Sequence, residues 1–579
     1  MGKGRVTLTP LIHHYFKGQI MLDSKYRQME LQDALKLIDY SMPCMFDTET
    51  CGFYGKIRLA QFYQRHFEFP VIVEWPNAFE LAAALTKLHV VGHRISYDIS
   101  TIQDNLGKQP WQPDKYDDTF LAGRIHWYMK DGFGLDNCVQ YAKGFNPYAD
   151  NDQQASDWSV PVLSENQKEY AAMDVVYLHD VYDQVQPVLD DLSYKLDILT
   201  TRYLMEMQCN GMPVDEGKLN ERYAKNMKRI AEIGLKINCN SYQQVRAYIG
   251  SQLSDDHGLA VLSAQGNERA VAVRETRKLT KNNSFLTKFL NTMVDGVIYG
   301  KFTVGARSGR TTSDDQNLQQ LPRSLKSIFG VDEDGEDVIV FSDFAQIQLR
   351  AVCVVTGDTA LERLFRAGAD LHDFVAEMIF GKDWKRDPHR QIAKTANFAL
   401  LFGAGILVFI AVLLKDTGIW LKEMEAGNIK KKWLGLWLQV AAWQTKGIRD
   451  WKKGIAWQTP LGRKYTAKMM TDQLAMQIQG FEAEVAKLAM HYMMPKIKEL
   501  DTRIKLRNFV HDCYLFTCPK EPELYEKLCV IIADSMQEAW RQMCTSVPIT
   551  DLPMPVKVRV GYNWGDIDKN DIFIYEHKQ

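Results

Sequence analysis

Two aspartates, 169 residues apart, constrain this chain most. Asp343 ends the apolar stretch VIVFSDF, and Asp512 stands in RNFVHDCYLFTC, where a polar tip separates two apolar stretches. The first pattern predicts a strand that leads into an amphipathic helix, and the second predicts a β-hairpin. Between them, RQIAKTANFALLFGAG predicts a helix with regularly spaced cations. Two carboxylates at strand ends and a cationic helix are what nucleotidyl transfer with two divalent metal ions requires.

The composition indicates a large globular protein. The chain has 579 residues, enough for about three or four domains, and its 46% hydrophobic content is ordinary. The longest apolar run, from Ile406 to Leu414, is too short to cross a bilayer and predicts a buried helix, so we expect no membrane partner. The N-terminal stretch lacks the features of a secretory signal. The ten cysteines include no CxxC pair, which predicts reduced cysteines, no structural zinc and a cytoplasmic location.

Charge is divided unevenly along the chain. The net charge is −2, but residues 1–190 carry 17 Lys+Arg against 25 Asp+Glu, and the remaining 389 residues carry 53 against 47. An acidic module that collects metal ions, joined to a basic body that binds a polyanion, fits this division. Chance variation between domains explains it equally well.

A second set of carboxylates lies in the first 180 residues. CMFDTETC predicts a strand on which Asp47 and Glu49 point to one side, because alternate strand residues share a face. Asp98 follows a short strand at the start of a helix, and Tyr170 and Asp174 share one face of a later helix. Singly, such acids are more often solvated surface residues. Together, they can converge on two hard cations about 3.5–4 Å apart.

In this order the residues resemble the DEDD 3′–5′ exonucleases of the DEDDy subtype. The matching pieces are DTE at 47–49, GHxxxxD at 92–98, DDT at 117–119 and YxxxD at 170–174. The resemblance implies an RNase H-like domain over residues 1–190, in which Tyr170 orients the attacking water. It also implies that four acids hold two metal ions: Asp47, Glu49, Asp98 and Asp174. Arg94 stands where this family commonly has Asn, and a DNA phosphate contact and a pairing with a neighbouring acid both explain it.

The middle of the chain predicts long helices followed by a polar loop. From about 191 to 300 the pattern is helical, with a Lys-rich stretch that suits a clamp along a duplex backbone. An ordinary helical connector is equally consistent. The loop TVGARSGRTTSDDQNLQQLPRS then offers polar side chains for sugar, phosphate or base edges: Arg310, Asn317, Gln319 and Arg323.

The cationic helix has side chains suited to a nucleoside triphosphate. Arg390, Lys394, Phe398 and Phe402 are each four residues apart, so they follow one slowly drifting helix face. The cations suit the β and γ phosphates, and the aromatics suit a sugar and a base. Glycines after Phe402 end the helix. A solvated cation stripe with core aromatics is the alternative, although a simple amphipathic helix does not place both on one face.

These residues resemble family A DNA polymerases, the Pol I-like enzymes. Motif A of that family is close to DYSQIELR, motif B is RxxxKxxxFxxxYG, and motif C is HDE. This chain has DFAQIQLR at 343–350, a motif B match at 390–403 with Phe402 in the Tyr place, and HDC at 511–513. Smaller pieces also match: GR before QNLQ at 309–319, DxH at 370–372, TPLGRKY at 459–465 and QIQG at 477–480. With the exonuclease motifs, the resemblance spans nearly the whole chain.

The resemblance implies a multidomain α/β fold, with the RNase H-like exonuclease domain followed by a right-hand polymerase. We expect the thumb over 191–300, the palm over 301–357 and 475–579, and the fingers over 358–474. Asp343 and Asp512 would ligate both metal ions, with the Phe344 carbonyl assisting.

The resemblance also implies a nucleotide site and a duplex site. Arg390, Lys394 and His372 would bind the triphosphate. Phe398 would lie against the sugar, and Phe402 would stack by the nascent pair. The residues expected to contact DNA are Arg310, Asn317, Gln319, Gln479 and His511. The primer 3′-hydroxyl would attack the α-phosphate, with Lys394 as general acid to the leaving group.

Three positions depart from the family. Gln348 replaces a Glu and Phe402 replaces a Tyr that approach each other in the family, which indicates a coupled change because either alone leaves a buried polar group unpaired. Gln348 has nearly the bulk of the Glu that blocks a ribose 2′-hydroxyl, so we predict that ribonucleotides are still largely rejected. Cys513 replaces the Glu of HDE, so we expect activity with a somewhat altered metal preference.

We therefore expect a template-directed DNA polymerase with 3′–5′ proofreading that acts in replication. The expected cofactor is Mg²⁺, two ions per active site, with Mn²⁺ able to substitute. Primer–template DNA and dNTPs are the expected partners of a monomer, and a processivity or replisome factor is left open. The exonuclease motifs begin by residue 47, leaving no room for a 5′-nuclease, and this compactness suggests a phage-encoded enzyme in the host cytoplasm.

Two alternatives remain at this point. A single-subunit RNA polymerase shares similar palm motifs, but the proofreading module and Phe398 count against it. An exonuclease with a degenerate polymerase scaffold would explain the three departures. The intact set of motif residues counts against that alternative: Asp343, Asp512, Arg390 and Lys394.

Overall fold

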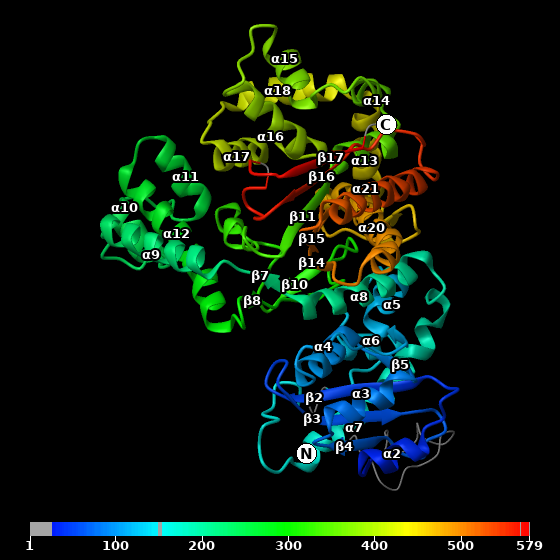
Figure 1. Ribbon diagram of the computed structural model, residues 1–579. Coiled ribbons are helices and arrows are strands. Elements are labelled where there is room, and N and C mark those ends of the chain that lie inside the picture. Colours follow the sequence, from blue (N-terminus) through cyan, green and yellow to red (C-terminus); the bar gives the residue numbers. More distant parts are fainter. Residues whose placement is uncertain (1–25, 149–152, 568, 578–579) are drawn as a thin grey trace, which may run out of the picture. The chain divides into compact units, whose positions relative to one another are not determined.

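The computed structural model describes residues 26–148, 153–567 and 569–577 (Figure 1). The chain forms two compact units, Met1–Cys209 and Asn210–Gln579. Both units mix helices and strands, as a multidomain α/β fold requires. Among the described residues, no helix combines the length and apolarity needed to span a membrane.

The first unit is built on a six-stranded sheet. The strand order is β1 (Arg27–Gln28), β4 (Val71–Glu74), β3 (Lys56–Tyr63), β2 (Cys44–Cys51), β5 (His89–Gly92) and β6 (Lys115–Asp118). Strand β3 runs antiparallel to both neighbours, whereas β2, β5 and β6 are mutually parallel. Six consecutive residues of β3 are buried, which is the pattern of a strand covered on both faces.

Helices surround this sheet. In chain order they are α2 (Leu31–Leu37), α3 (Ala78–Thr86), α4 (Ile95–Asn105), α5 (Thr119–His126), α6 (Leu135–Lys143), α7 (Glu165–Val185), the 3₁₀ turn η1 (Gln186–Val188) and α8 (Leu192–Asn210). Helices α4 and α7 both pack against β2 and β3, the strands that carry or adjoin the first acids. A capping box between Ser164 and Gln167 starts α7, which fixes where its acidic face begins.

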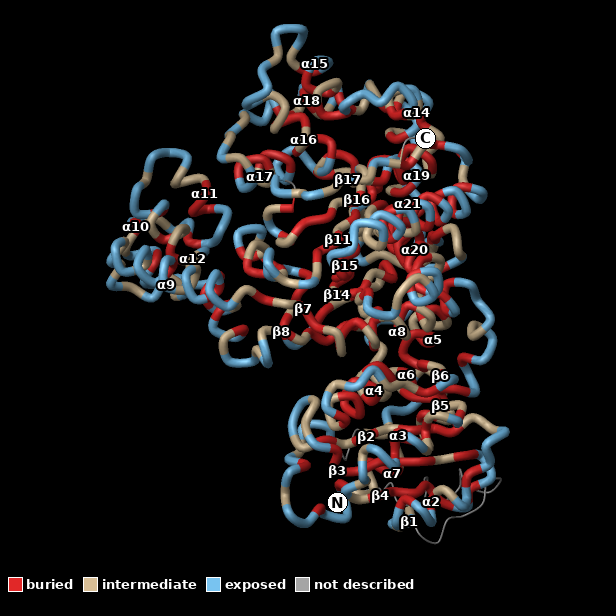
Figure 2. Tube along the Cα trace, in the orientation of Figure 1, coloured by how far each residue is buried: buried red, intermediate tan, exposed pale blue. Residues whose placement is uncertain are grey.

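The second unit has a five-stranded antiparallel sheet at its centre. Its order is β14 (Lys505–Val510), β15 (Cys513–Pro519), β11 (Asp337–Phe344), β16 (Val556–Gly561) and β17 (Phe573–Glu576). Helix α21 (Pro522–Cys544) packs on β11, β15 and β16 and on the long α20 (Met470–Leu500), which in turn packs on α13 (Ile347–Thr356). Figure 2 shows buried residues concentrated in these elements.

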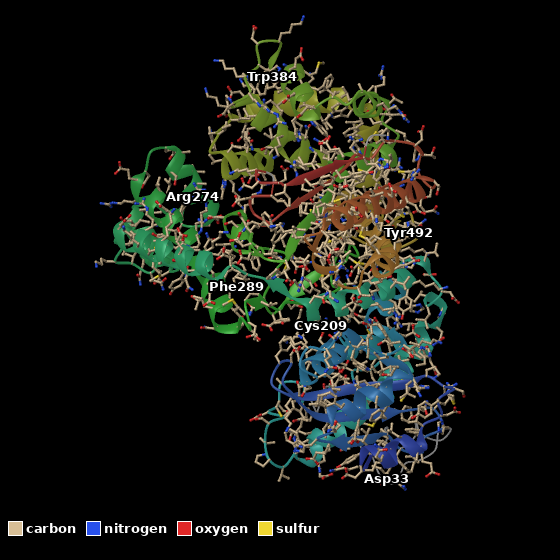
Figure 3. All side chains as sticks on the ribbon, in the orientation of Figure 1. Asp33, Cys209, Arg274, Phe289, Trp384 and Tyr492 are labelled. Carbon is tan, nitrogen blue, oxygen red and sulfur yellow. The ribbon has the colours of Figure 1, made fainter. Side chains whose placement is uncertain are left out.

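A group of four helices precedes this sheet in the chain. It comprises α9 (Glu216–Ile233), α10 (Tyr242–Ile249), α11 (Asp256–Ala264) and α12 (Glu268–Thr292). Short strands β7 (Met212–Pro213), β8 (Val297–Ile298), β9 (Lys301–Thr303) and β10 (Thr312–Asp314), with the 3₁₀ turn η2 (Arg323–Ile328), link it to the sheet. The ring centroid of Phe289 on α12, which is labelled in Figure 3, lies 5.6 Å from the ring centroid of Phe329. The expected thumb began at residue 191, but α8 belongs to the first unit up to Cys209.

The remaining helices lie between the two halves of the sheet in sequence. They are α14 (Thr359–Arg366), α15 (Leu371–Phe380), α16 (His389–Leu401), α17 (Ile406–Thr417), α18 (Glu423–Leu436) and α19 (Leu438–Lys452), followed by the hairpin of β12 (Trp457–Gln458) and β13 (Lys464–Tyr465). The expectation that the apolar run at 406–414 is buried holds only for its second part. Ile406, Leu407 and Val408 are exposed, Leu407 by 66%. Hydrophobicity alone does not show which turn of a helix its neighbours cover.

Candidate active sites

Four acids of the first unit gather around β2. Ligand oxygens of Asp47, Glu49 and Asp174 lie within 4.8 Å of one another. The fourth acid, Asp98 of α4, accepts a 2.7 Å hydrogen bond from the Thr48 hydroxyl on the same strand as Asp47. The alternation of β2 thus places Asp47 and Glu49 on one side and ties Asp98 to the residue between them. The structure brings the ligand oxygens of Asp47, Glu49 and Asp174 together and places Asp98 near enough for Asp47 to raise its pKa.

Burial raises the pKa of every acid in this cluster, and Asp47 raises the pKa of the other three. Burial raises the pKa of Asp47 to about 7. Burial and then Asp47 raise the pKa of Glu49, Asp98 and Asp174 well above the ordinary range. Buried carboxylates this close repel when ionised, and a divalent cation relieves the repulsion. Clustered carboxylate oxygens are also the ligands that Mg²⁺ and Ca²⁺ prefer. The donor set therefore fits a hard divalent ion.

Aromatic residues line the same cluster. Tyr170 lies one turn before Asp174 on α7, and its ring centroid is 5.1 Å from that of Tyr148. The Tyr148 hydroxyl donates a hydrogen bond to Asp174. Burial and then Asp174 raise the pKa of Tyr148 well above its ordinary value, so this phenol stays a donor. Sequence reasoning missed Tyr148, because it follows helix α6 in a segment without a periodic pattern.

Arg94 takes a left-handed backbone conformation before α4. Its φ is 61°, and its backbone N–H donates to Asp118 at 3.0 Å. A side chain with a local acceptor such as Asn adopts this conformation more easily than Arg, which accounts for the usual residue at this position. The Arg94 guanidinium lies over the Phe120 ring, 4.4 Å from its centroid. The neighbouring acid, Asp118, therefore binds the backbone of Arg94.

In the second unit, strand register brings the two principal aspartates together. Asp343 on β11 pairs directly with Cys513 on β15, and Asp512 immediately precedes that residue. His511, at the tip of the β14–β15 hairpin, has φ 61° and lets the chain reverse before Asp512. The predicted strand, helix and hairpin around these residues are present as β11, α13, β14 and β15.

The environment of Asp512 contains other acids. Burial, then Glu482 and then Asp343 raise the pKa of Asp512 to about 7. Burial, followed by the two aspartates, raises the pKa of the Cys513 thiol well above its ordinary value, so it is uncharged. Its Sγ lies 3.7 Å from an Asp512 oxygen, within range of a weak S–H donor. Cys513 thus removes a charge from the position where HDE has a carboxylate.

Glu482 is a third acid that sequence reasoning missed. It lies on α20, is only 2% exposed, and forms an ion pair with Arg310. The Gln348 side chain also hydrogen-bonds to it, and both partners oppose the rise in the pKa of Glu482 that burial causes. The signal in the sequence was a pair of acids, Glu482 and Glu484, among the many apolar residues of QIQGFEAEVAKLAM. Gln348 therefore has a hydrogen-bond partner in Glu482, and the coupled change of Gln348 and Phe402 stays a prediction.

The nucleotide-binding helix predicted from motif B is α16, but it ends at Leu401. Phe402 is the C-cap residue, with φ −94°, and lies outside the helix. Arg390 is held by two ion pairs, with Asp373 at 2.5 Å and Asp370 at 2.6 Å. Lys394 is half-buried, and Phe398 is 39% exposed. Phe398 is therefore not a core residue, in line with the functional interpretation of this face.

His372 is fixed by a residue that the motifs do not include. Its Nδ1 lies 2.9 Å from the Asn397 amide nitrogen, and the Asn397 oxygen accepts a 2.8 Å bond from the Trp433 indole. Because the Asn397 amide nitrogen can only donate, His372 carries its proton on Nε2. Burial lowers the pKa of His372, which favours this neutral form. Asn397 is thus a supporting residue of the predicted triphosphate site.

The residues expected to contact DNA differ in exposure. Gln319 is buried, and its amide nitrogen donates to the Thr311 hydroxyl at 2.7 Å and to the Phe509 carbonyl at 2.8 Å. It therefore supports the loop from inside, which differs from the expectation that it faces a duplex. The Asn317 side chain accepts from the Gln320 N–H at 3.0 Å. Gln479 is half-buried, and His511 is exposed.

Comparisons with known proteins identify the polymerase unit. A family model described as DNA polymerase family A matches residues 215–566, which is more than half of the chain. The chain belongs to DNA polymerase family A. A second model, described as 3′-5′ exonuclease, matches residues 26–190. The expected order of an exonuclease domain and a family A polymerase domain is therefore confirmed, and the RNA polymerase-like and scaffold alternatives are not favoured.

Relatives with similar sequences are described as DNA polymerase I. DNA polymerase I of Aquifex aeolicus is 26% identical over 566 residues, covering 90% of this chain and 96% of the relative. DNA polymerase I of Chloroflexus aurantiacus is 25% identical, and the match spans about half, 48%, of that longer protein. A solved POL domain of Pol1 from M. smegmatis, in complex with DNA primer-template and dNTP, superposes with a TM-score of 0.74 at 20% identity. It covers 94% of this chain and 100% of that structure. The structural likeness supports the fold.

Proposed function

We propose that this polymerase extends DNA primers with dNTPs and removes mispaired 3′ ends, with two divalent metal ions at each site. The observation that carries the proposal is the register of β11 and β15. It pairs Asp343 with Cys513, the residue that follows Asp512, so both aspartates lie at the same end of two adjacent strands. Mg²⁺ is the proposed ion because the ligands are hard oxygen donors.

Synthesis depends on how the palm residues hold the reacting groups. Asp343 and Asp512, with the Phe344 carbonyl, would hold the ions. When bound, these ions lower the pKa of the primer hydroxyl and stabilise the departing pyrophosphate. Cys513 stays uncharged beside them, so two aspartates carry the ligand charge. The mechanism needs no third ligand from motif C.

The fingers residues orient the triphosphate. Arg390, Lys394 and neutral His372, with its proton on Nε2, supply donors to phosphate oxygens. Lys394 is the proposed general acid to pyrophosphate. Phe398 would pack on the sugar, and Phe402, at the end of α16, would stack by the nascent pair. Gln348 would approach the sugar 2′ position.

DNA contact is proposed for residues around the loop and the hairpin tip. Arg310, Asn317, Gln479 and His511 would face the duplex near the primer end, and Gln319 would hold the loop in place. Positive and polar groups at these positions bind phosphates and sugar oxygens without reading the sequence. A processivity factor, a monomeric state, a phage origin and a cytoplasmic location stay predictions.

Proofreading is assigned to the acid cluster of the first unit. Asp47, Glu49, Asp98 and Asp174 would hold the two metal ions, and the Tyr170 hydroxyl would orient the attacking water. The Tyr148 hydroxyl bond to Asp174 restricts the rotation of that ligand. The DEDDy assignment rests on Tyr170 lying one turn before Asp174 on α7.

Primer extension with separate point variants tests the proposal. Wild-type protein should extend a 5′-labelled primer with dNTPs and shorten a mispaired primer when dNTPs are withheld. Asp343→Ala should stop extension only, and Asp47→Ala should stop shortening only. Loss of both activities in either variant, with an unchanged melting temperature, would contradict the assignment of separate sites.

A further inference from the structure

Three elements of the polymerase unit meet at the buried Glu482. Arg310 comes from the loop between β9 and β10, Gln348 from the first turn of α13, and Glu482 from the middle of α20. The Arg310 side chain is 15% exposed and that of Glu482 is 2% exposed, so the ion pair is largely shielded from water. A buried pair that lacks one member leaves an uncompensated charge, so each partner constrains the other.

The chemistry of positions 348 and 482 is linked. A carboxylate accepts hydrogen bonds and does not donate them, whereas an amide does both. Gln348 can therefore donate to Glu482, but a glutamate at 348 would place two carboxylates in contact. Arg310 forms an ion pair with Glu482 and opposes the rise in the pKa of Glu482 that burial causes. The three side chains form one set with a single carboxylate, a single guanidinium and a single amide.

This set lies next to the proposed reaction centre. Glu482 is the acid with the largest electrostatic effect on Asp512, ahead of Asp343. Gln348 lies five residues after Asp343 on the helix that follows β11. Gln348 and Arg310, the two partners of Glu482, are the residues proposed for the sugar and for the primer end. Because the Glu482 carboxylate holds both of these side chains, it acts on the positions of the substrate sugar and the primer end.

A second buried acid on the same helix, Glu484, has partners that indicate a structural role. Glu484 is fully buried, accepts a hydrogen bond from the Thr459 hydroxyl, and accepts one from the Leu461 N–H at 3.2 Å. Gly480 permits this close approach of α20, because a Cβ there would lie 2.5 Å from the Thr459 methyl. These partners belong to the segment that connects β12 and β13, not to the elements that carry Gln348 and Arg310.

We propose that Glu482 is a positioning residue for nucleotide selection: it holds the Gln348 amide toward the sugar and the Arg310 guanidinium toward the primer end. The inference rests on the proposed polymerase function and deepens it. The orientation of Gln348, and with it the discrimination between dNTPs and rNTPs, then depends on a carboxylate from α20. Positions 348 and 482 act as a donor–acceptor pair whose members are exchangeable only together.

Steady-state single-nucleotide incorporation by the full chain tests this role. Glu482→Gln should lower kcat/KM for dNTPs by about tenfold to a hundredfold, the size expected for a hydrogen-bonded charged group. The loss for rNTPs should be smaller, so the dNTP/rNTP ratio falls. Gln348→Glu should lose dNTP incorporation because two carboxylates meet. The reciprocal double variant Gln348→Glu/Glu482→Gln restores one amide and one carboxylate and should recover at least about tenfold over Gln348→Glu.

Glu484→Gln is the matched control. It removes another buried carboxylate from α20 and should lower the melting temperature while leaving the dNTP/rNTP ratio unchanged. The exonuclease activity of each variant on single-stranded DNA reports its folded concentration. Equal losses for dNTPs and rNTPs in Glu482→Gln, or strictly additive effects in the double variant, would overturn the inference. Failure of the wild-type chain to extend primers at all would instead overturn the proposed polymerase function.

Discussion

The two acidic sites of this enzyme differ in how the repulsion between neighbouring carboxylates is offset. In the exonuclease unit, four buried acids with raised pKa values lie around one strand, and hydroxyl groups of Thr48 and Tyr148 bind two of them. In the polymerase unit, the third acid near the aspartates is neutralised by Arg310 and bonded to Gln348. The first arrangement leaves the repulsion for metal ions to relieve. In the second, a resident cation already pairs with the extra carboxylate, and we propose that this carboxylate shapes the site instead of binding metal.

The largest expected effect separates the two sites by single substitutions. Asp343→Asn should lower single-turnover incorporation by at least about a thousandfold, because one of two metal ligands is lost, and Asp47→Asn should do the same to exonuclease hydrolysis. Each variant should keep the other activity within about threefold. Rapid-quench assays of both reactions on one primer–template measure this. A large loss of the untouched activity would break the comparison.

Metal binding should stabilise the protein in a pH-dependent manner. The folded-state pKa of Asp47 and of Asp512 is raised to about 7, so the folded protein binds more protons than the unfolded chain between about pH 4 and 7. The free energy of unfolding of the metal-free protein therefore falls as the pH rises through this window. Asp47 and Asp512 each contribute at most about 1.4 kcal/mol per pH unit to this slope.

Denaturant unfolding with EDTA at pH 5 and pH 8 measures this effect, and Mg²⁺ should reverse it at pH 8. Asp47→Asn should flatten the pH dependence of the first unit and reduce the gain from Mg²⁺. An unchanged pH profile in that variant would show that the exonuclease acids do not cause the pH dependence.

A smaller effect is expected at Tyr148. Tyr148→Phe removes the hydroxyl that binds Asp174, so exonuclease kcat should fall by about fivefold to thirtyfold, with synthesis unchanged. Tyr177→Phe is the matched control, because its ring lies 5.8 Å from that of Tyr148. Equal effects of the two variants would show that aromatic packing, and not the hydroxyl, matters.

The smallest effect is expected at Cys513. Cys513→Ser exchanges one uncharged side chain for another opposite Asp343, so synthesis should stay within about threefold. Cys513→Glu introduces a carboxylate and should shift the Mg²⁺ concentration for half-maximal rate. Primer extension across a Mg²⁺ titration compares them. An identical titration for both variants would show that this position does not affect the ions.

Local patterns predicted the main elements well. The alternation in β2 placed Asp47 and Glu49 on one side, and the strand and hairpin at Asp343 and Asp512 form adjacent strands of one sheet. These predictions succeeded because strand alternation and the polar tip of a hairpin are determined by residues only a few positions apart. Asp98 also followed from its place at a helix start.

Features that depend on long-range packing were not predictable. Glu482 looks like an ordinary acid in a largely apolar stretch of helix, and its partner Arg310 lies 172 residues away in the sequence. Asn397 looks like an ordinary helix residue until His372 and Trp433 are placed on either side of it. The expectation of a buried start to α17 failed for the same reason, since a run of apolar residues does not show what lies opposite.

The two ion pairs of Arg390 have a consequence for ligand exchange. Asp370 and Asp373 already occupy this guanidinium, so an arriving anion competes with resident carboxylates instead of entering a bare cationic hole. A monodentate anion such as phosphate or chloride gains little from that exchange. A triphosphate that engages Lys394 and His372 at the same time offsets the lost pairs through several bonds. We expect this internal competition to keep ordinary cellular anions from occupying the proposed triphosphate site on α16 before a nucleotide binds.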